Sequence, residues 1–365
     1  MIEQLLARKE VCICAGSGGV GKTTTAAAIA LGMAARGRKV AVLTIDPAKR
    51  LANSLGLPEL GNDERRVAVD GLQGELWAMM LDAKRTFDEL IEWHAPDERT
   101  RDAVLANPIY QELSSAVAGS QEYMAMEKLF ELHREGRYDL LVLDTPPSAS
   151  AFDFLEAPAK LSAFIDSRSL RLFTAPGRLG FRLFGRGGGV LFSVMRRATG
   201  IDLLEDLSEF FRSFGDMSEG FRERAARVEA LLASARTAFV LVTSPRRRAI
   251  GEAMAFHHRL LDAGLPLSGV VVNRVHAVGG DATTEGLTGP AGPELTRKVA
   301  DSLADNRRLA EGDRANLQAL KRRLRRKPMI EVPELDEEVH DLEGLQRVGG
   351  HLFGTGPGGA VTSRA

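Results

Sequence analysis

The chain has little cysteine, almost no net charge and no long apolar run, and each shortage argues against a class of protein. Its two cysteines, Cys12 and Cys14, lie two apart in one apolar segment, where strand geometry places them poorly for a disulfide. No histidine-rich motif or further cysteine completes a metal site. The pattern favours a reduced, cytoplasmic protein in which both residues are small core side chains.

Charge and hydropathy argue against further classes. A formal net charge of -1 gives no overall field for nucleic acid or an anionic membrane. No run of about 18 apolar residues occurs, so we expect no integral membrane segment, and residues 1–10 lack the pattern of a signal peptide. A basic run over 321–327 is followed by six acids over 334–343, which favours a solvated helix face or mutual pairing over nucleic-acid binding.

Seven apolar runs of strand length alternate with helical stretches. They are rich in Val, Leu and Ile and show little polar alternation, as expected of strands buried on both faces. This order predicts an α/β fold with a doubly wound, mostly parallel sheet, whose chemistry lies at the carboxyl ends of the strands. The runs are Val11–Ala15, Val40–Ile45, Leu76–Leu81, Leu140–Leu143, Ala238–Thr243, Gly269–Val272 and Met329–Val332.

Residues 151–235 contain no strand candidate and hold 11 of the chain's 16 phenylalanines. Apolar residues from Leu203 to Phe221 recur at a 3–4 spacing, which predicts an amphipathic helix, whereas 170–194 is both apolar and glycine-rich. This segment is either a site for an apolar client or a helical core and dimer interface, and the sequence leaves both open. The predicted division is a core over 1–150 and 236–353, a helical, Phe-rich insertion over 151–235 and a disordered tail over 354–365.

Residues 16–24 read Gly-Ser-Gly-Gly-Val-Gly-Lys-Thr-Thr and follow the first predicted strand, directly before a helix predicted over Thr24–Arg36. This is the G-x-x-x-x-G-K-[ST] loop of P-loop NTPases, whose glycines let backbone N–H groups converge on phosphate oxygens. Lys22 would neutralise the β- and γ-phosphates of ATP, and the Thr23 hydroxyl would bind Mg²⁺. The predicted nucleotide-binding residues are Gly16, Ser17, Gly18, Gly19, Val20, Gly21, Lys22, Thr23 and Thr24.

Three other predicted strands end near polar residues. Asp46 would orient and deprotonate the attacking water, or simply cap the turn before Pro47. Asp144 closes an apolar strand as a Walker B acid does and would hold Mg²⁺ through a water, although a strand-end acid alone is more often a cap. The Asn273 carboxamide matches the N6 and N7 edges of adenine, or it occupies a turn.

Together these motifs resemble the ArsA and guided-entry (tail-anchored protein targeting) ATPase family. The resemblance covers most of the chain: the P-loop, Asp46-Pro47-Ala48 as switch I, Asp144 to Ser148 as switch II, Asn273 and Val332-Pro333. Two segments, Thr44–Leu51 and Gln121–Lys128, indicate its actinobacterial anion-transporting-ATPase-like branch. Within the second, Gln121-Glu122-Tyr123 precedes a helix predicted over Met124–Glu135, and it either contributes to a dimer interface or a ligand contact or merely starts the helix.

The resemblance implies a mechanism. Family members are dimers that close around two ATP molecules and open on hydrolysis, and their helical domains move with them. By this resemblance Asp46 activates water, Thr23 and Asp144 hold Mg²⁺, and Lys22 stabilises the transferring phosphoryl group. The insertion lies where the family carries its substrate-binding helices, which implies a hydrophobic protein segment or a lipid as client.

The chain departs from the family at Ser17, where the family's signature lysine reaches across the dimer to the partner's phosphates. A homodimer would then lack this contact, whereas a heterodimer with a lysine-bearing paralogue would restore it on one side. The alternative is a catalytically weak, nucleotide-binding regulatory subunit. The chain also lacks the C-x-x-C of zinc-bridged members and the cysteine set of arsenite-pump subunits, so we expect neither a zinc bridge nor arsenite transport.

Overall fold

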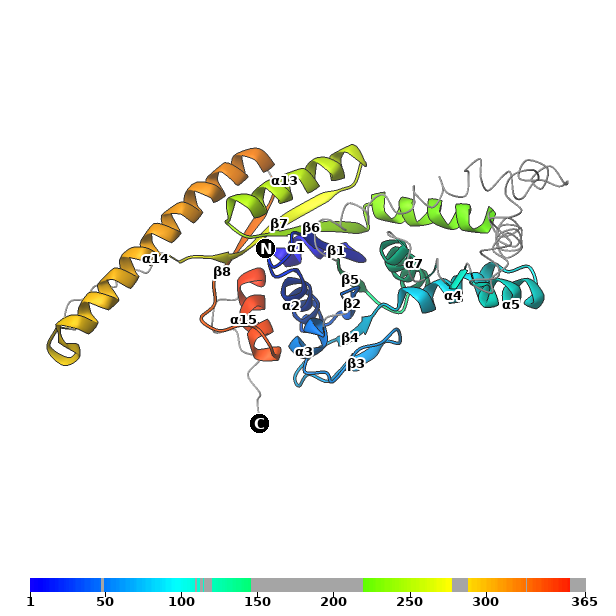
Figure 1. The fold of residues 1–365 in the computed structure, drawn as a ribbon, viewed down its shortest axis with the longest axis horizontal. Helices are drawn as coiled ribbons and strands as arrows, with labels where there is room; N and C mark the ends of the chain where they lie inside the picture. Colours follow the sequence, from blue (N-terminus) through cyan, green and yellow to red (C-terminus); the bar gives the residue numbers. More distant parts are fainter. Residues whose placement is uncertain are drawn as a thin grey trace, which may run out of the picture. The chain divides into compact units, whose positions relative to one another are not determined.

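A computed structural model describes residues 1–46, 49–108, 110, 111, 114, 120–145, 219–277, 288–325 and 327–354. Its centre is an eight-stranded sheet in the order β3-β4-β2-β5-β1-β6-β7-β8, in which only β3 and β4 are antiparallel among these strands (Figure 1). The predicted α/β fold with a mostly parallel, doubly wound sheet is therefore confirmed. The strands are β1 (Val11–Gly16), β2 (Lys39–Thr44), β3 (Arg65–Val67), β4 (Glu75–Met80), β5 (Leu140–Asp144), β6 (Thr237–Thr243), β7 (Leu267–Val275) and β8 (Met329–Pro333).

The described residues divide into two compact units. All eight strands lie in the unit made of 1–80, 132–145 and the part from Ala233 onward, and the other unit contains 81–131 and 219–232. The predicted boundaries at 151–235 stay a prediction, because most of that segment, with 170–194, lies outside the described residues, as does 355–365. The helices are α1 (Ile2–Leu6), α2 (Lys22–Ala34), α3 (Arg50–Ser54), α4 (Ala83–His94), α5 (Glu98–Ala106), α7 (Ser120–Glu135), α13 (Arg247–Asp262), α14 (Thr288–Leu324) and α15 (Leu342–Phe353).

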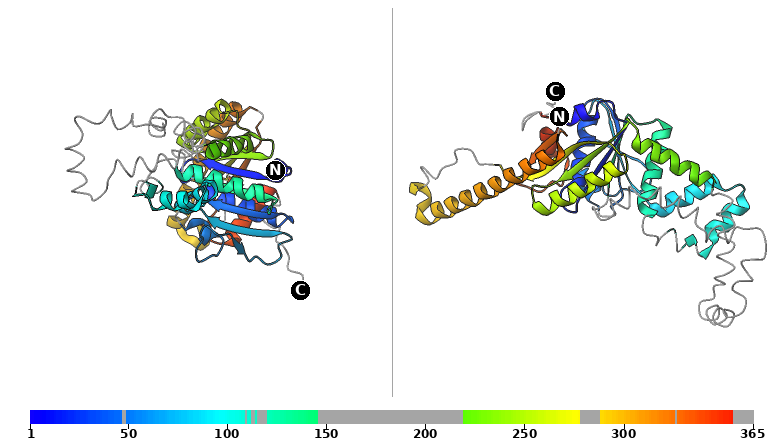
Figure 2. Two further views of the ribbon diagram at one scale, coloured as in Figure 1. Left: turned by 90° about the vertical axis from the view of Figure 1, so that its right-hand side faces the viewer. Right: turned by 90° about the horizontal axis from the view of Figure 1, so that it is seen from above.

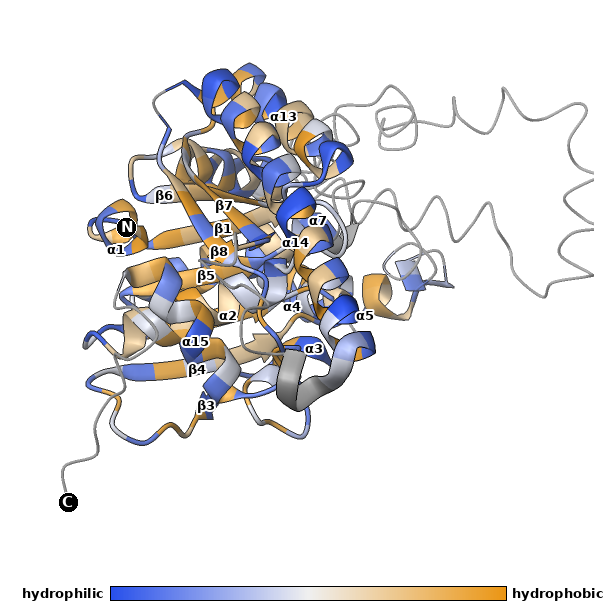
Figure 3. Cartoon of the chain, turned by 90° about the vertical axis from the view of Figure 1, so that its left-hand side faces the viewer, coloured by the Kyte–Doolittle hydropathy of each residue, from blue (hydrophilic) through white to orange (hydrophobic). Residues whose placement is uncertain are grey.

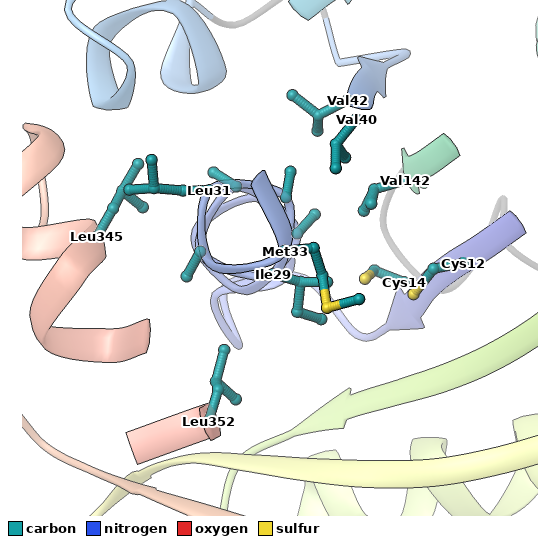
Figure 4. Packing of buried hydrophobic residues seen from close by; sticks show 14 of the residues in the cluster. Cys12, Cys14, Ile29, Leu31, Met33, Val40, Val42, Val142, Leu345 and Leu352 are labelled. Atoms are coloured by element: carbon teal, nitrogen blue, oxygen red, sulfur yellow. The ribbon is translucent and has the colours of Figure 1, made fainter. Parts of the chain in front are cut away.

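The sheet is buried on both faces, which explains its nearly continuous apolar strands. The central strands β1, β5 and β6 are hydrophobic along their length (Figure 3). On one face, Cys12, Cys14 and Val142 of the strands lie on one side of α2, and α15 packs against the other side of α2 (Figure 4). Both thiols are free and fully buried, so in this structure they are core side chains.

The strand register brings the predicted site residues to one edge of the sheet. Asp144, the last residue of β5, lies opposite Cys14 of β1 and opposite Thr44 of β2. The P-loop therefore leaves β1, and Asp46 leaves β2, at the level where β5 presents its carboxylate. Helix α3 follows Asp46 and lies beside α2 (Figure 1). Parallel strands thus assemble a site from segments about 100 residues apart.

Several elements differ from the sequence prediction, among them β3, α2 and β7. Strand β3 was not expected, because it has only three residues and its two arginines are exposed. Helix α2 begins at Lys22 rather than Thr24, since Gly21 occupies the N-cap position with φ +88°. Strand β7 continues to Val275, so Asn273 lies within the strand, followed by Arg274 in the left-handed region at φ +60°.

The second unit contains a buried ion pair between Arg224 and Glu127. The Tyr123 hydroxyl donates to Glu127 Oε2 at 3.4 Å, and the Arg224 guanidinium lies 5.1 Å from the ring centres of both Trp93 and Phe130. Helix α7 begins at Ser120, so Tyr123 belongs to the helix rather than to a segment before it. The Tyr123 side chain is 3% exposed, which places this part of the predicted interface motif inside the unit.

Helix α14 is the longest described element, with 37 residues and a kink at Gly292 (Figure 2). Its basic end lies within reach of acidic residues, since Lys321 Nζ is 3.9 Å from Glu331 Oε1. Glu331 precedes the acids over 334–343, so the pairing of the basic run with that stretch stays a prediction. Among the residues that the structure describes, no helix combines the length and the apolar character needed to cross a membrane.

Candidate functional site

The loop between β1 and α2 depends on glycine for its path. Gly21 has φ +88°, and a Cβ at this position would lie 2.3 Å from Nδ2 of Asn273, so a larger residue would both strain the backbone and displace that side chain. Helix α2 starts at the next residue, and Lys22, Thr23 and Thr24 line a cavity of about 700 Å³. The first N–H groups of the helix and its positive dipole end favour an anion at this position.

Lys22 is held inside the loop. Its ammonium donates to the Ser17 carbonyl at 2.9 Å, and the residue is 7% exposed. Burial lowers the pKa of Lys22, while the nearby charges of Asp144 and Asp46 oppose that shift. A phosphate oxygen would offer this ammonium a stronger, charge-assisted hydrogen bond than the carbonyl does.

Asp144 is the most deeply buried acid of the cavity edge and fits a magnesium site. Its Oδ2 accepts hydrogen bonds from Thr23 Oγ1 at 2.7 Å and from Thr44 Oγ1 at 3.0 Å. Its Oδ1 is buried and has no hydrogen-bond partner, so one carboxylate oxygen is left for a water or an ion. Among the described residues, no group of three or more His, Cys, Asp or Glu is arranged to hold a metal ion, but Mg²⁺ in phosphate sites needs only one or two carboxylates beside phosphates and waters.

Burial raises the pKa of Asp144 to about 6, against the lowering effects of Thr23, Thr44 and Lys22. The folded-state pKa is thus above the unfolded value near 4, so this group's contribution to stability is complete below about pH 4 and is lost as the pH rises through 6.

In EDTA, Asp144→Asn should raise the free energy of unfolding by about 1–3 kcal/mol at pH 8. Denaturant titrations at pH 5 and pH 8 measure it; a gain equal at both would contradict the burial argument.

Asp46 lies at the mouth of the same cavity. Its backbone N–H donates to Thr44 Oγ1 at 3.2 Å, and its Oδ2 accepts from Arg50 Nη1 at 3.5 Å. The Asp46 side chain is 23% exposed, so a water held at the cavity can reach the carboxylate. The next two residues of the predicted switch I, Pro47 and Ala48, lie outside the described residues, as do those that follow Thr145 in switch II.

Asn273 lines the cavity and also braces the P-loop. Its Nδ2 donates to the Val20 carbonyl at 3.0 Å, and its Oδ1 accepts from the backbone N–H of Arg274 at 3.0 Å. One N–H and one lone pair of the carboxamide remain for a ligand. Thr145 directly follows β5 and also lines the cavity, and its hydroxyl donates to the Cys14 carbonyl at 2.9 Å.

The structure brings most of the predicted site residues to this one cavity. Of the P-loop, the described lining includes Gly19, Gly21, Lys22, Thr23 and Thr24, but not Gly16, Ser17, Gly18 or Val20. Asp46 and Asn273 also line it, and Asp144 reaches it through the hydroxyl of Thr23.

Sequence reasoning missed several lining residues. They come from α3, from the end of β7 and from the segment after β8: Arg50, Asn53, Ser54, Arg274, Glu334, Leu335, Asp336, Glu337, Glu338, Val339 and His340. Asp46 precedes α3 and Arg50 is its first residue, so no helical spacing in the sequence indicated their contact. The segment after β8 offered no local signal.

Comparison with known proteins gives a consistent result. The family model described as anion-transporting ATPase matches residues 9–283. The chain is 27% identical to "ATPase GET3" of Malassezia globosa over 265 residues, covering 72% of this chain and 71% of that protein. It is 24% identical to "Putative arsenical pump-driving ATPase 1" of Aquifex aeolicus over 355 residues, covering 95% of this chain and 79% of that protein.

Proposed function

We propose that ATP is cleaved in the cavity at the carboxyl edge of the sheet. The premise is that this chain belongs to the anion-transporting ATPase family and is an ATPase that uses ATP with Mg²⁺. One observation carries the proposal. A P-loop lysine, a buried Thr23–Asp144 pair and the carboxylate of Asp46 meet around one cavity of about 700 Å³. Phosphoryl transfer needs these parts and little other protein chemistry.

Each residue has a role that follows from its contacts. Lys22 exchanges the Ser17 carbonyl for the β- and γ-phosphate oxygens and stabilises charge on the transferring group. Thr23 and Asp144 hold Mg²⁺, which when bound neutralises phosphate charge. Asn273 offers its remaining N–H and lone pair to the edge of adenine while it braces the loop.

Asp46 serves as the general base. Its carboxylate orients a water and takes a proton from it as the water oxygen bonds to the γ-phosphorus. The bond from that phosphorus to the β–γ bridging oxygen breaks, and ADP leaves with the bonding electrons. Asp46 fits this role because it is partly exposed at the cavity mouth and its backbone is tied to Thr44 beside the metal-binding Asp144.

The ATPase cycle is proposed to open and close a dimer and to move an apolar helical site formed by 151–235. The support is the family resemblance together with the concentration of phenylalanine in that segment. The client of such a site is a hydrophobic protein segment or a lipid. The free, buried state of Cys12 and Cys14 supports a cytoplasmic location.

A second candidate is a heterodimer in which this chain is the catalytically weak partner. Ser17 carries no charge and is 5% exposed, and its backbone carbonyl accepts a hydrogen bond from the Lys22 ammonium. A paralogue with lysine at this position would reach into the site of this chain, whereas this chain would not reciprocate. Such a pair is asymmetric, so its two sites would differ in turnover.

Ser17→Lys tests this dimer account. If the isolated chain lacks a cation supplied by its twin, the variant should raise the steady-state rate of phosphate release by tenfold or more, since trans cations of this kind are worth about 10³–10⁵ in rate. Molar mass measured by light scattering with ATP and Mg²⁺ shows whether the rate follows dimer formation. Ser17→Met, which adds length without charge, should give no gain; a wild-type rate for Ser17→Lys in an ATP-dependent dimer would refute the account.

A further inference from the structure

Arg50 occupies a position in the cavity that the proposed catalytic set does not use. It is the first residue of α3 and lines the same cavity as Lys22 and Thr23. Its Nη1 reaches Asp46 Oδ2 at 3.5 Å, the upper limit of a hydrogen bond, and its side chain is 70% exposed. An exposed and long contact of this kind contributes little free energy, so the guanidinium can change partners at small cost.

The described lining of the cavity carries more acids than basic side chains. Its described lining includes four acids after β8, at positions 334, 336, 337 and 338. Lys22 is buried, whereas Arg50 lines the same cavity with a largely exposed side chain, so the Arg50 guanidinium is the more accessible of the two cations. Arg274 is the other arginine in the lining, but it follows Asn273, at the end proposed for adenine.

Arginine is suited to a terminal phosphate. Its planar fork donates two parallel hydrogen bonds to phosphate oxygens, and such charge-assisted pairs are stronger than a single bond to a partly solvated carboxylate. The γ-phosphate of ATP is therefore a better partner for Arg50 than Asp46 is. ADP offers no oxygen at that position.

We propose that Arg50 is the residue that recognises the γ-phosphate, in the same subunit, and that it exchanges Asp46 for this phosphate when ATP binds. Without nucleotide, Arg50 restrains the Asp46 carboxylate. With ATP, the guanidinium moves to the γ-phosphate, and the Asp46 carboxylate loses its contact with Arg50. The inference rests on the proposed function, because it assigns a partner to the ATP that this function places in the cavity. Arg50 thus provides a cation for the phosphate from the same subunit.

The test compares binding of a non-hydrolysable ATP analogue and of ADP, each with Mg²⁺, by isothermal titration calorimetry. Arg50→Ala should weaken the ATP analogue about 10- to 100-fold, the range for a hydrogen bond to a charged group, and change ADP affinity less than twofold. Arg50→Lys should recover part of the discrimination, because a point charge replaces the fork. Lys49→Ala removes an exposed charge one residue away that does not line the cavity, so it should behave as wild type.

Retained ADP affinity shows that each variant is folded at the site, and an equal loss for both nucleotides would overturn the proposal. So would a wild-type ratio of the two affinities in Arg50→Ala. Either result leaves the proposed function intact as long as the wild-type chain binds and cleaves ATP. If the wild-type chain binds neither nucleotide, the proposed function itself fails.

Discussion

Lys22→Ala should reduce kcat/KM for ATP hydrolysis by about 10²–10³-fold, the loss typical of removing one preorganised donor at a developing charge. The reason is local. Lys22 is 7% exposed, and its ammonium lies within hydrogen-bond distance of the Ser17 carbonyl, which phosphate oxygens would replace. Removing it leaves the loop without its positive side chain. Phosphate release measured over a range of ATP concentrations gives kcat and KM separately.

The control for this prediction is an exposed lysine that does not line the cavity. The Lys298 side chain on α14 is 66% exposed, forms an ion pair with Glu294 and does not line the cavity, so Lys298→Ala should keep the wild-type rate. Full activity in Lys22→Ala would refute the assignment of residues 16–24 as the catalytic phosphate-binding loop. Nucleotide affinity should fall as well, because Lys22 contacts phosphates in the ground state and in the transition state.

Asp46→Asn should keep ATP binding and lower kcat by about 10²–10⁴-fold, the usual contribution of a general base. Asparagine has the same shape and still accepts a hydrogen bond from Arg50, but its carboxamide takes no proton from water. If Asp46 only caps the turn before the next helix, the substitution should cost little, because asparagine caps as well as aspartate. Calorimetry for binding and phosphate release for turnover separate the two roles.

Asp82→Asn is the matched control for Asp46→Asn. Asp82 is the N-cap of α4, and its side chain accepts from the backbone N–H of Arg85 at 3.0 Å, so it is a capping aspartate outside the cavity. The same change there should leave the ATPase rate at its wild-type value. A loss of the same size in both variants would point to folding rather than to catalysis.

The sheet could be predicted because burial on both faces leaves a simple pattern in the sequence. Strand β1 is apolar from end to end and β5 is apolar up to its last residue, Asp144, and the polar residues at these strand ends fall where ligands meet parallel sheets. Strand β3 was not predicted, because its three residues pair antiparallel with β4 at the edge of the sheet and two of them are exposed to solvent. Such a strand is defined by its neighbour β4 rather than by its own composition.

The chemistry of the site was predictable where a motif is local. The glycines and Lys22 of the P-loop lie within nine residues, and Asp144 closes a recognisable strand. The brace from Asn273 to the Val20 carbonyl joins residues 253 positions apart, and no local pattern encodes it. The acids after β8 reach the cavity only because β8 lies next to β7 in the sheet.

A single-turnover experiment tests the central claim most directly. Protein in excess over γ-labelled ATP, with Mg²⁺, is quenched at successive times, and bound ATP and released phosphate are counted. The account predicts that wild type converts its bound ATP to ADP and phosphate, that Asp46→Asn retains ATP uncleaved, and that Lys22→Ala retains little nucleotide. Cleavage at the wild-type rate by either Asp46→Asn or Lys22→Ala would contradict the assignment of this cavity as the site of hydrolysis.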